Sequence, residues 1–343
     1  MPCPAPGLRQ EGRRITVKRA ALPDVTCVGA VVADVIVRPV DRWPERGRLQ
    51  VVEGIELHSG GPAHTAAVAL ARLGVSTALV GRVGADPFGT FLIDALDRHG
   101  IESRVRQDDA AATSVSVVAV GSGGERSFMH HTGANGRVIA GDVDDALLGR
   151  TRFLHLGGYF LLPSLDGAAA AGLLQRGRSA GCRTSIDLAW DAQGRWMATL
   201  APCLPSLDVF FGNRDELAAV TGEENPPAIA ALLRRRGVQV VVVKLGEEGA
   251  YVEGETWRGR LPAFAVEAVD TTGAGDVFCA GFLAGLLWGW DLEEAARFAS
   301  AAGAMCVTAV GGTAGVGTKE ETLAFIRRTP SRIDEARPRR SAT

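Results

Sequence analysis

The segment Asp270-Thr-Thr-Gly-Ala-Gly-Asp276 has the strongest potential for chemistry, because it joins small residues and acids to an apolar run, Val277–Leu287. Glycines before a helix let the backbone approach a ligand, and the unpaired N–H groups of the first turn favour an anion. Those groups would belong to Gly273, Ala274, Gly275 and Asp276. A carboxylate suits this place if it accepts a proton from a hydroxyl that attacks a bound phosphoryl group. The alternative is an ordinary helix start with an acid in its first turn.

Lys244 is the second candidate. It ends the apolar run Val238–Val243 and precedes a turn that contains Gly246 and Gly249. The chain holds 37 basic residues, and the only lysines besides Lys244 are Lys18 and Lys319. A lysine at the end of a buried strand can reach a phosphate as a mobile point charge. A solvated strand end is the alternative interpretation.

The composition excludes several classes of protein. Among 343 residues, 46% are hydrophobic and 22% are charged, which is typical of a globular protein and not of a disordered or fibrous one. The 37 basic and 39 acidic residues balance, whereas a nucleic-acid-binding protein is expected to carry a basic excess. The six cysteines show no CxxC spacing, which predicts a reduced, cytoplasmic protein without a zinc site. The uncharged segment from Val277 onward is too short to cross a membrane.

Short β-branched runs alternate with segments of helical length, which favours a mainly parallel sheet covered by helices on both faces. The expected strands are 25–29, 78–80, 153–156, 184–187, 209–211 and 238–244. The expected helices are 62–73, 88–99, 166–180, 213–221, 226–236, 275–289, 291–309 and 319–328. Residues 1–24 are predicted to be a disordered extension and 329–343 a tail, on either side of one domain, 25–328.

Two stretches interrupt this alternation, at about 38–59 and 112–131. They contain extended, alternating segments such as Gln50–Glu53 and Ser114–Val118, with turn glycines after the second. We expect them to form a small, discontinuous β-sheet that projects from the core. It would cover a binding cleft, form a homodimer contact, or do both, because open sheet edges invite pairing.

Four motifs in sequence resemble the ribokinase-like (PfkB) carbohydrate kinases. The segment Asp270–Phe282 is similar to the second signature of that family, and His58–Gly74 to the first. Asn213-Arg-Asp-Glu216 resembles an Asn-x-x-Glu element, and Lys244–Ala250 resembles the glycine turn before the nucleotide site. The resemblance covers about 25–328. It implies a three-layer α/β/α core with a mainly parallel sheet, a small β-sheet lid, and an ATP-dependent kinase.

On the sugar side, the resemblance assigns roles to single positions. Asp276 matches the catalytic base, and Gly273, Ala274 and Gly275 the anion hole. Asp34 matches the acid that binds sugar hydroxyls, with a strand-end cap as the alternative. Gly60 and Gly61 match the glycine pair beneath the sugar. Thr65 stands where the family usually has Asn, and Asn135 follows the second lid segment, where it would bind substrate or be an ordinary loop residue.

On the nucleotide side, Asn213 and Glu216 match the pair that orders Mg²⁺-bound water, although a helix cap gives the same spacing. Lys244, Gly246, Gly249, Gly273, Gly275 and Ser300 match positions near ATP. Asp270 and Thr272, with backbone near Gly311, resemble a monovalent-cation loop, so K⁺ is an implied cofactor beside ATP and Mg²⁺.

The departures from the family bear on the substrate. Thr65 replaces a sugar-binding amide, and Asp187-Leu-Ala189 lacks the Asn that often follows its acid by two residues. The expected acceptor is therefore a small polyhydroxylated molecule, a sugar or sugar acid, without a named sugar. A nucleoside kinase of the same fold is one alternative, for which Trp43 and Phe128 are the lid aromatics at hand. A sugar-binding protein that lost turnover is the other.

Overall fold

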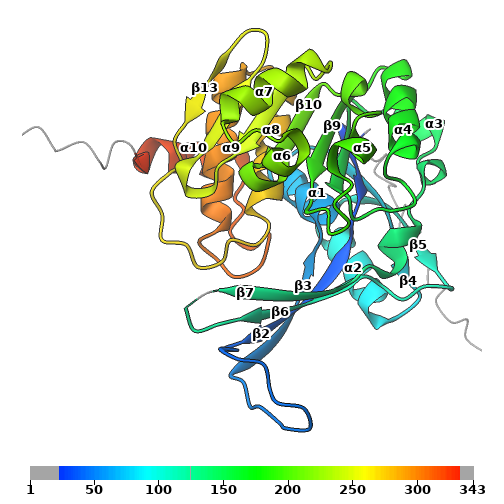
Figure 1. Ribbon diagram of the computed structural model, residues 1–343, viewed down its shortest axis with the longest axis vertical. Coiled ribbons are helices and arrows are strands. Elements are labelled where there is room, and N and C mark those ends of the chain that lie inside the picture. The colour runs from blue at the N-terminus through cyan, green and yellow to red at the C-terminus, as the bar shows by residue number, and fades with distance from the viewer. Residues whose placement is uncertain (1–22, 124, 333–343) are drawn as a thin grey trace, which may run out of the picture.

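The structure, a computed structural model, describes residues 23–123 and 125–332. Its main sheet has nine strands in the order β13-β12-β11-β10-β9-β8-β1-β4-β5 (Figure 1). The strands from β11 to β5 in this order are parallel, and β12 and β13 form an antiparallel edge. They are β1 (Val25–Gly29), β4 (Thr77–Gly84), β5 (Glu102–Asp108), β8 (Phe153–Tyr159), β9 (Arg183–Leu188), β10 (Val209–Asn213), β11 (Val240–Lys244), β12 (Ala250–Glu253) and β13 (Arg258–Leu261).

Helices cover both faces of this sheet. One layer holds α1 (Pro62–Arg72), α2 (Pro87–Arg98), α8 (Ala274–Leu287) and α9 (Leu292–Cys306), with α10 (Lys319–Arg328) beside it. The other holds α3 (Asp145–Leu148), α4 (Ala168–Ser179), α5 (Trp196–Leu200), α6 (Arg214–Thr221) and α7 (Pro226–Arg235). Successive side chains of one strand point to opposite faces. Val240 and Val242 accordingly pack in the first core, and Val241 and Val243 in the second.

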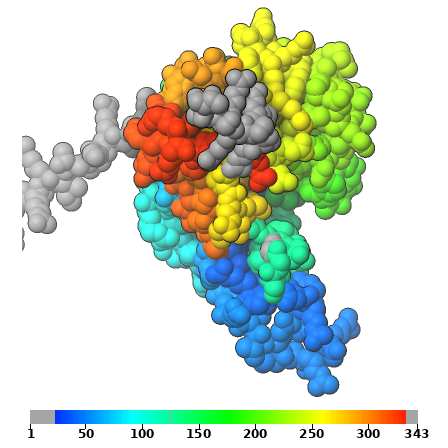
Figure 2. All heavy atoms as spheres, turned by 90° about the vertical axis from the view of Figure 1, so that its left-hand side faces the viewer, coloured from blue at the N-terminus to red at the C-terminus, as the bar shows by residue number. Residues whose placement is uncertain are grey.

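A second sheet of four strands forms the lid, in the order β3-β2-β6-β7. Its strands are β2 (Val32–Arg38), β3 (Gly54–Gly60), β6 (Val115–Val120) and β7 (Arg126–His131). It extends from the body as an arm, below the main sheet in Figure 1 and mainly blue in Figure 2. β2 pairs antiparallel with β3 and parallel with β6, and β6 pairs antiparallel with β7.

The expected α/β/α architecture with a small β-sheet lid is confirmed, and the expected strands and helices are present with small shifts at their ends. The first lid strand begins at Val32, upstream of the expected stretch, so that Asp34 belongs to the lid. The expected extended segment Gln50–Glu53 is wrong as a strand. The strand follows it, because Ile55 and Leu57 alternate with Glu56 and His58 along β3.

The chain ends fall partly outside the described residues. The predicted extension lies outside them up to residue 22, as does the predicted tail from 333 onward. Within the described part of that tail, Ser331 forms a β-bridge with Phe264, and Arg332 Nη1 donates to Glu247 Oε2 at 2.7 Å. Among the described residues, no helix is long and apolar enough to cross a membrane.

Candidate active site

The start of α8 forms the centre of the site. Gly273 precedes the helix with a φ of 72°, a left-handed conformation that favours glycine. A Cβ at this position would lie 2.7 Å from the carbonyl oxygen of Gly312. Among residues 23–123 and 125–332, no acceptor is found for the N–H groups of Gly273, Gly275 and Asp276. The first turn of a long helix therefore presents free backbone donors, which is the arrangement that an anion needs.

Most predicted nucleotide-binding residues line one cavity. Its volume is about 380 Å³, and the wall includes Asn213, Lys244, Gly246, Gly249, Gly275 and Ser300. Its apolar surface comes from side chains such as Phe264 and Phe278. The structure thus brings together residues that are far apart in the sequence, at the carboxyl ends of β10 and β11 and at the start of α8.

The two glycines of the turn after β11 have different surroundings. Gly246 has a φ of 59° and nothing within 4 Å of a Cβ position, so it faces open space at the cavity. Gly249 has a φ of 98°, and a Cβ there would lie 1.9 Å from the carbonyl oxygen of Leu261. The backbone contact with β13 therefore accounts for Gly249 by itself, without a ligand.

Lys244 is held by an acid that the sequence analysis did not assign. Its Nζ donates to Asp187 Oδ1 at 2.6 Å, and the Asp187 side chain at the end of β9 is only 2% exposed. A Cβ at residue 275 would lie 3.0 Å from the same Nζ, so Gly275 leaves room for the ammonium beside the helix start. Burial disfavours the ammonium, but Asp187 and further acids nearby raise the pKa of Lys244 above its ordinary value. Lys244 is therefore a fixed positive charge next to the free N–H groups.

Asn213 and Glu216 form a capping box at the start of α6. Asn213 Oδ1 accepts from Glu216 N at 2.8 Å, and Glu216 Oε2 accepts from Asn213 N at 2.9 Å. The helix-cap interpretation of this spacing is thus realised. Burial raises the pKa of Glu216 to about 7, although Lys244 acts in the opposite direction. Oε1 of Glu216 has no hydrogen-bond partner among the described residues and is left for a further interaction.

Asp34 lies on the lid directly over Gly60. A Cβ on Gly60 would be 2.0 Å from Asp34 Oδ2, so glycine is required for the carboxylate to occupy this place. Burial raises the pKa of Asp34 to about 6, against a hydrogen bond from Ser116 and the proximity of His58. On the next strand, Ser116 also contacts His130 Nδ1 at 3.1 Å. Asp34 is therefore an acceptor within a polar lid face, where its partner is a side chain of the neighbouring strand β6.

The remaining predicted sugar-side residues act mainly through backbone and packing. Gly61, with a φ of 91°, would place a Cβ 2.6 Å from the carbonyl oxygen of Ala30, so it allows β1, β3 and α1 to meet. Thr65 is 2% exposed and lies beneath the loop: its Cγ2 is 2.9 Å from a Cβ position on Gly273. In this structure Thr65 therefore packs against the loop Asp270–Gly273, which leads into α8.

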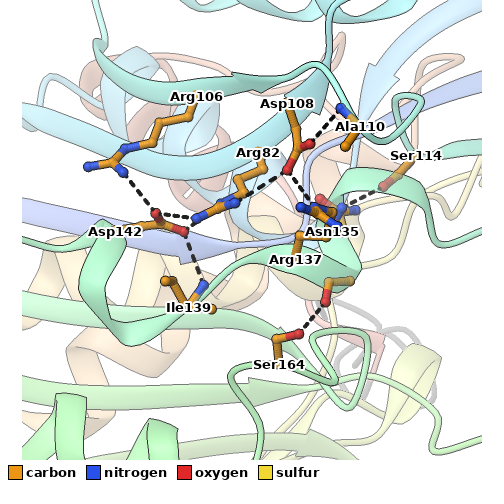
Figure 3. Close-up of polar contacts among 11 residues, drawn as sticks. Arg82, Arg106, Asp108, Ala110, Ser114, Asn135, Arg137, Ile139, Asp142 and Ser164 are labelled. Atoms are coloured by element: carbon orange, nitrogen blue, oxygen red, sulfur yellow. Dashed lines mark hydrogen bonds and ion pairs between the residues drawn. The ribbon is translucent and has the colours of Figure 1, made fainter.

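Asn135 lies where the lid connections meet the body (Figure 3). Its Oδ1 accepts from Val31 N, and its own N–H donates to Ser114 Oγ, each at 3.1 Å. The residue is 1% exposed, and Nδ2 has no partner among the described atoms. Beside it, Arg82 and Arg137 share Asp108, and Arg82 also binds Asp142 (Figure 3). This network fastens the end of β5 to the segment that leaves β7.

Asp270 and Thr272 lie in the loop that leads into α8. Asp270 Oδ1 accepts from Thr272 N at 2.7 Å, and Oδ2 accepts from Gly311 N at 2.8 Å. Arg126 from β7 donates to Asp270 Oδ1 and to Thr272 Oγ1. Burial acts to raise the pKa of Asp270, but these hydrogen bonds and the guanidinium hold it below its ordinary value. The predicted cation loop thus already contacts a positive charge.

The charge of Asp276 interacts with those of other carboxylates. Burial and the neighbouring Asp187 raise its pKa above the ordinary value, Glu216 and Asp34 add to this effect, and Lys244 opposes it. Four acids and one lysine therefore interact around the first turn of α8. A carboxyl group with a raised pKa near neutral pH is suited to exchange a proton with a hydroxyl.

Several residues of this site were assigned no role in the sequence analysis. Asp187 had a usable signal, because it is a lone acid at the carboxyl end of a buried strand in a parallel sheet. Arg126, His58 and Ser116 carried no such signal, since their positions depend on strand pairing within the lid. Among the described residues, no group of three or more His, Cys, Asp or Glu side chains could hold a metal ion.

Comparisons with known proteins show the family to which this chain is related. The family model of the pfkB family carbohydrate kinases matches residues 22–319. The chain is 33% identical to the ATP-dependent ribose-1-phosphate kinase of Halopiger xanaduensis, over 82% of this chain and 90% of that protein. It is 29% identical to fructokinase-2 of Oryza sativa subsp. japonica, over 79% of this chain and 86% of that protein.

Solved structures agree as well. The ribokinase of Arabidopsis thaliana, solved with ribose and ATP, superposes with a TM-score of 0.77. The two sequences are 26% identical, and the match covers 89% of this chain and 99% of the ribokinase.

Proposed function

Because this chain belongs to the pfkB family of carbohydrate kinases, we propose that it transfers the γ-phosphoryl group of ATP to a hydroxyl of a sugar or sugar acid, with Asp276 as the general base. One observation carries the proposal. Asp276 stands in the first turn of α8 beside free N–H groups, and its charge interacts with those of Lys244 and of the lid carboxylate Asp34. Acceptor, base and anion site would thus meet at one point.

ATP would occupy the cavity of about 380 Å³. The apolar wall with Phe264 and Phe278 suits an adenine ring, and Ser300 lies in the same wall. The phosphates would then run past Lys244 toward the free N–H groups at the start of α8. Preorganised donors of this kind stabilise the charge that develops on a transferring phosphoryl group.

The sugar would lie between the lid and the body. Asp34 would accept hydrogen bonds from its hydroxyls, over the backbone of Gly60 and Gly61. In the reaction, the attacking hydroxyl oxygen bonds to the γ-phosphorus as the bond from phosphorus to the β-phosphate oxygen breaks. The hydroxyl proton passes to Asp276, and ADP leaves. The products are therefore a sugar phosphate and ADP.

Mg²⁺ fits the residues at this site. Residues 23–123 and 125–332 form no all-protein cage for a metal ion. Mg²⁺ commonly keeps several waters and is bound through substrate phosphates. Glu216 and Asn213 would hold it through water, because one oxygen of Glu216 has no partner within the described part of the chain. When bound, Mg²⁺ would neutralise charge on the phosphates. It would also reduce the repulsion among the four acids around Asp276.

We also propose that the outer face of the lid joins two copies of the chain. Leu57, Val35, Val117 and Met129 form one row across the four strands, on the face opposite to Asp34. Leu57 is 42% exposed and Met129 53%, and Ile55 beside them is 66% exposed. An exposed apolar row on a sheet with open edges favours association. Sedimentation of wild type and of Leu57→Glu at the same concentration tests this contact.

We further expect the protein to be cytoplasmic.

Asp276→Asn tests the catalytic assignment. Turnover should fall by about 10²- to 10⁴-fold, the usual contribution of a general base, while ATP still raises the melting temperature. Asp97→Asn, an exposed acid on α2, is the matched control for the loss of one charge. If Asp276→Asn kept wild-type turnover, the base assignment would be wrong.

The acceptor is identified by a panel of fructose, ribose, ribose 1-phosphate, gluconate and adenosine, with ADP release as the signal. A sugar or sugar acid as best acceptor supports the proposal. Preference for adenosine would instead assign a nucleoside kinase. Binding of a sugar without ADP release, in the presence of Mg²⁺, would indicate an inactive sugar-binding protein.

A further inference from the structure

Arg126 makes the only described contact between a charged side chain of β7 and the loop that leads into α8. Its guanidinium donates to Asp270 Oδ1 and to Thr272 Oγ1. Both ends of the ion pair are largely shielded from water, since the Arg126 side chain is 15% exposed and Asp270 is 7% exposed. An ion pair in this setting is screened much less than one on the surface.

The contact is built into the lid. Arg126 pairs with Val120 at the end of the lid hairpin, and Phe128 and His130 follow at alternate positions on the same face of β7. His130 contacts Ser116, which binds Asp34, so this is the face that carries the proposed sugar-binding carboxylate. Arg126 therefore reaches the body from the same side of the lid that would cover the sugar.

Asp270 joins two backbone segments of the site. Its carboxylate accepts from the N–H of Thr272 and from the N–H of Gly311. Thr272 directly precedes Gly273, and the carbonyl oxygen of Gly312, next to Gly311, packs 2.7 Å from a Cβ position on Gly273. The shape of the anion-hole loop thus depends on the carboxylate that Arg126 binds.

The charges at this point are already balanced. Asp270 contributes one negative charge and Arg126 one positive charge. The guanidinium of Arg126 donates to Asp270 Oδ1 and to the Thr272 hydroxyl. These are the two residues that resemble a monovalent-cation loop. A K⁺ ion added beside them would meet a like charge in a shielded setting, where repulsion is strong. The residues present therefore do not fit a K⁺ site.

We propose that the Arg126 guanidinium takes the place of a monovalent cation, and that this kinase works without K⁺. The inference rests on the proposed function, because it concerns the loop that would hold the phosphoryl group. Arg126 is a positioning residue: it acts on the reaction through Asp270 and Thr272.

The test compares wild type with Arg126→Met in K⁺, Na⁺ and tetramethylammonium chloride at equal ionic strength. We expect the turnover and the melting temperature of wild type to be the same in all three salts. For Arg126→Met without K⁺, turnover should fall by about 10- to 100-fold, as is usual when a supporting partner is lost. K⁺ should restore much of this loss and raise the melting temperature, because a bound ion stabilises the folded state.

Two further variants make the result decisive. Arg126→Lys keeps a cation in place and should stay insensitive to K⁺. Arg104→Met on β5 removes an arginine that is paired with Glu102 and should behave as wild type in every salt. If Arg126→Met does not fold, the Arg126→Lys and wild-type measurements still decide, because K⁺ activation of either one overturns the proposal.

The outcomes separate this inference from the proposed function. A wild-type enzyme that K⁺ activates and stabilises contradicts the inference, whatever its substrate. So does an Arg126→Met enzyme that is fully active without K⁺. The melting measurements need no turnover, so they decide the cation question even if no sugar in the panel is phosphorylated. A panel in which no sugar is phosphorylated would count against the proposed function alone.

Discussion

The nucleotide side and the lid side of this site are built in opposite ways. On the nucleotide side, backbone N–H groups and Lys244 stand on α8 and β11, within the packed body. On the lid side, Asp34, Ser116 and Arg126 stand on strands of a separate sheet that projects from the body. The first arrangement fixes charge where the phosphoryl group would pass. The second can vary its side chains without disturbing the main core.

This difference indicates which part sets the reaction and which sets the substrate. Donors that are held rigidly contribute most to stabilising a transition state. Specificity comes from polar groups that a wrong substrate leaves unpaired. Changes on the nucleotide side should therefore lower turnover with every sugar, and changes on the lid should alter the ranking of sugars.

Apart from Asp276→Asn, the largest effect is expected for Lys244→Met. Turnover should fall by about 10²- to 10³-fold, the usual result of removing one donor to a developing negative charge. Stability should fall too, by about 3–5 kcal/mol, because Asp187 would be left buried without its partner. Steady-state kinetics and urea unfolding measure the two effects.

The double variant Lys244→Met with Asp187→Leu separates them. It replaces both charges with apolar groups, so the free energy of unfolding should recover while turnover stays low. Recovery of both would assign Lys244 a structural role only, and the contrast between the two sides of the site would fail.

A smaller effect is expected for Asp34→Asn. Loss of hydrogen bonds to an ionised group costs about 1.5–3 kcal/mol, so kcat/KM should fall by about 10- to 100-fold. The decrease should differ among sugars, because each presents its hydroxyls differently. Asp41→Asn, an exposed acid elsewhere on the lid, is the matched control. An equal decrease for every sugar would contradict the division of roles.

The pH dependence gives the finest distinction. In the proposed mechanism, Asp34 and Asp276 both act as ionised groups, and burial raises both pKa values, that of Asp34 to about 6. Activity is therefore present above these pKa values and is lost as the pH falls through them. In wild type, kcat/KM should fall by about 100-fold per pH unit below both pKa values, and by about 10-fold in Asp34→Asn, where one group remains. If kcat/KM fell equally steeply with pH in the two proteins, ionised Asp34 would have no role in substrate binding.

The sequence predicted most of the body. Alternation of strand and helix indicated the parallel sheet, and the glycine-rich start of α8 is found as expected. The sequence was less informative where the same residue spacing suits both packing and ligand binding. Asn213 and Glu216 form a helix cap whether or not they also contact Mg²⁺-bound water, and Gly249 is accounted for by the nearby Leu261 carbonyl. In such cases the pattern is the same for packing and for binding.

The sequence by itself determined the chemistry that is local in the chain. Neighbouring residues alone predict three features: the acid at the third position of α8, the free N–H groups at the start of that helix, and the lysine that ends β11. The tertiary structure alone decided the partners that come from distant strands, such as Asp187 on Lys244, Asp34 over Gly60 and Arg126 on Asp270. The physical reason is that backbone conformation is set by local residues. Charge pairs depend on strand order and on the placement of the lid, which no local pattern encodes.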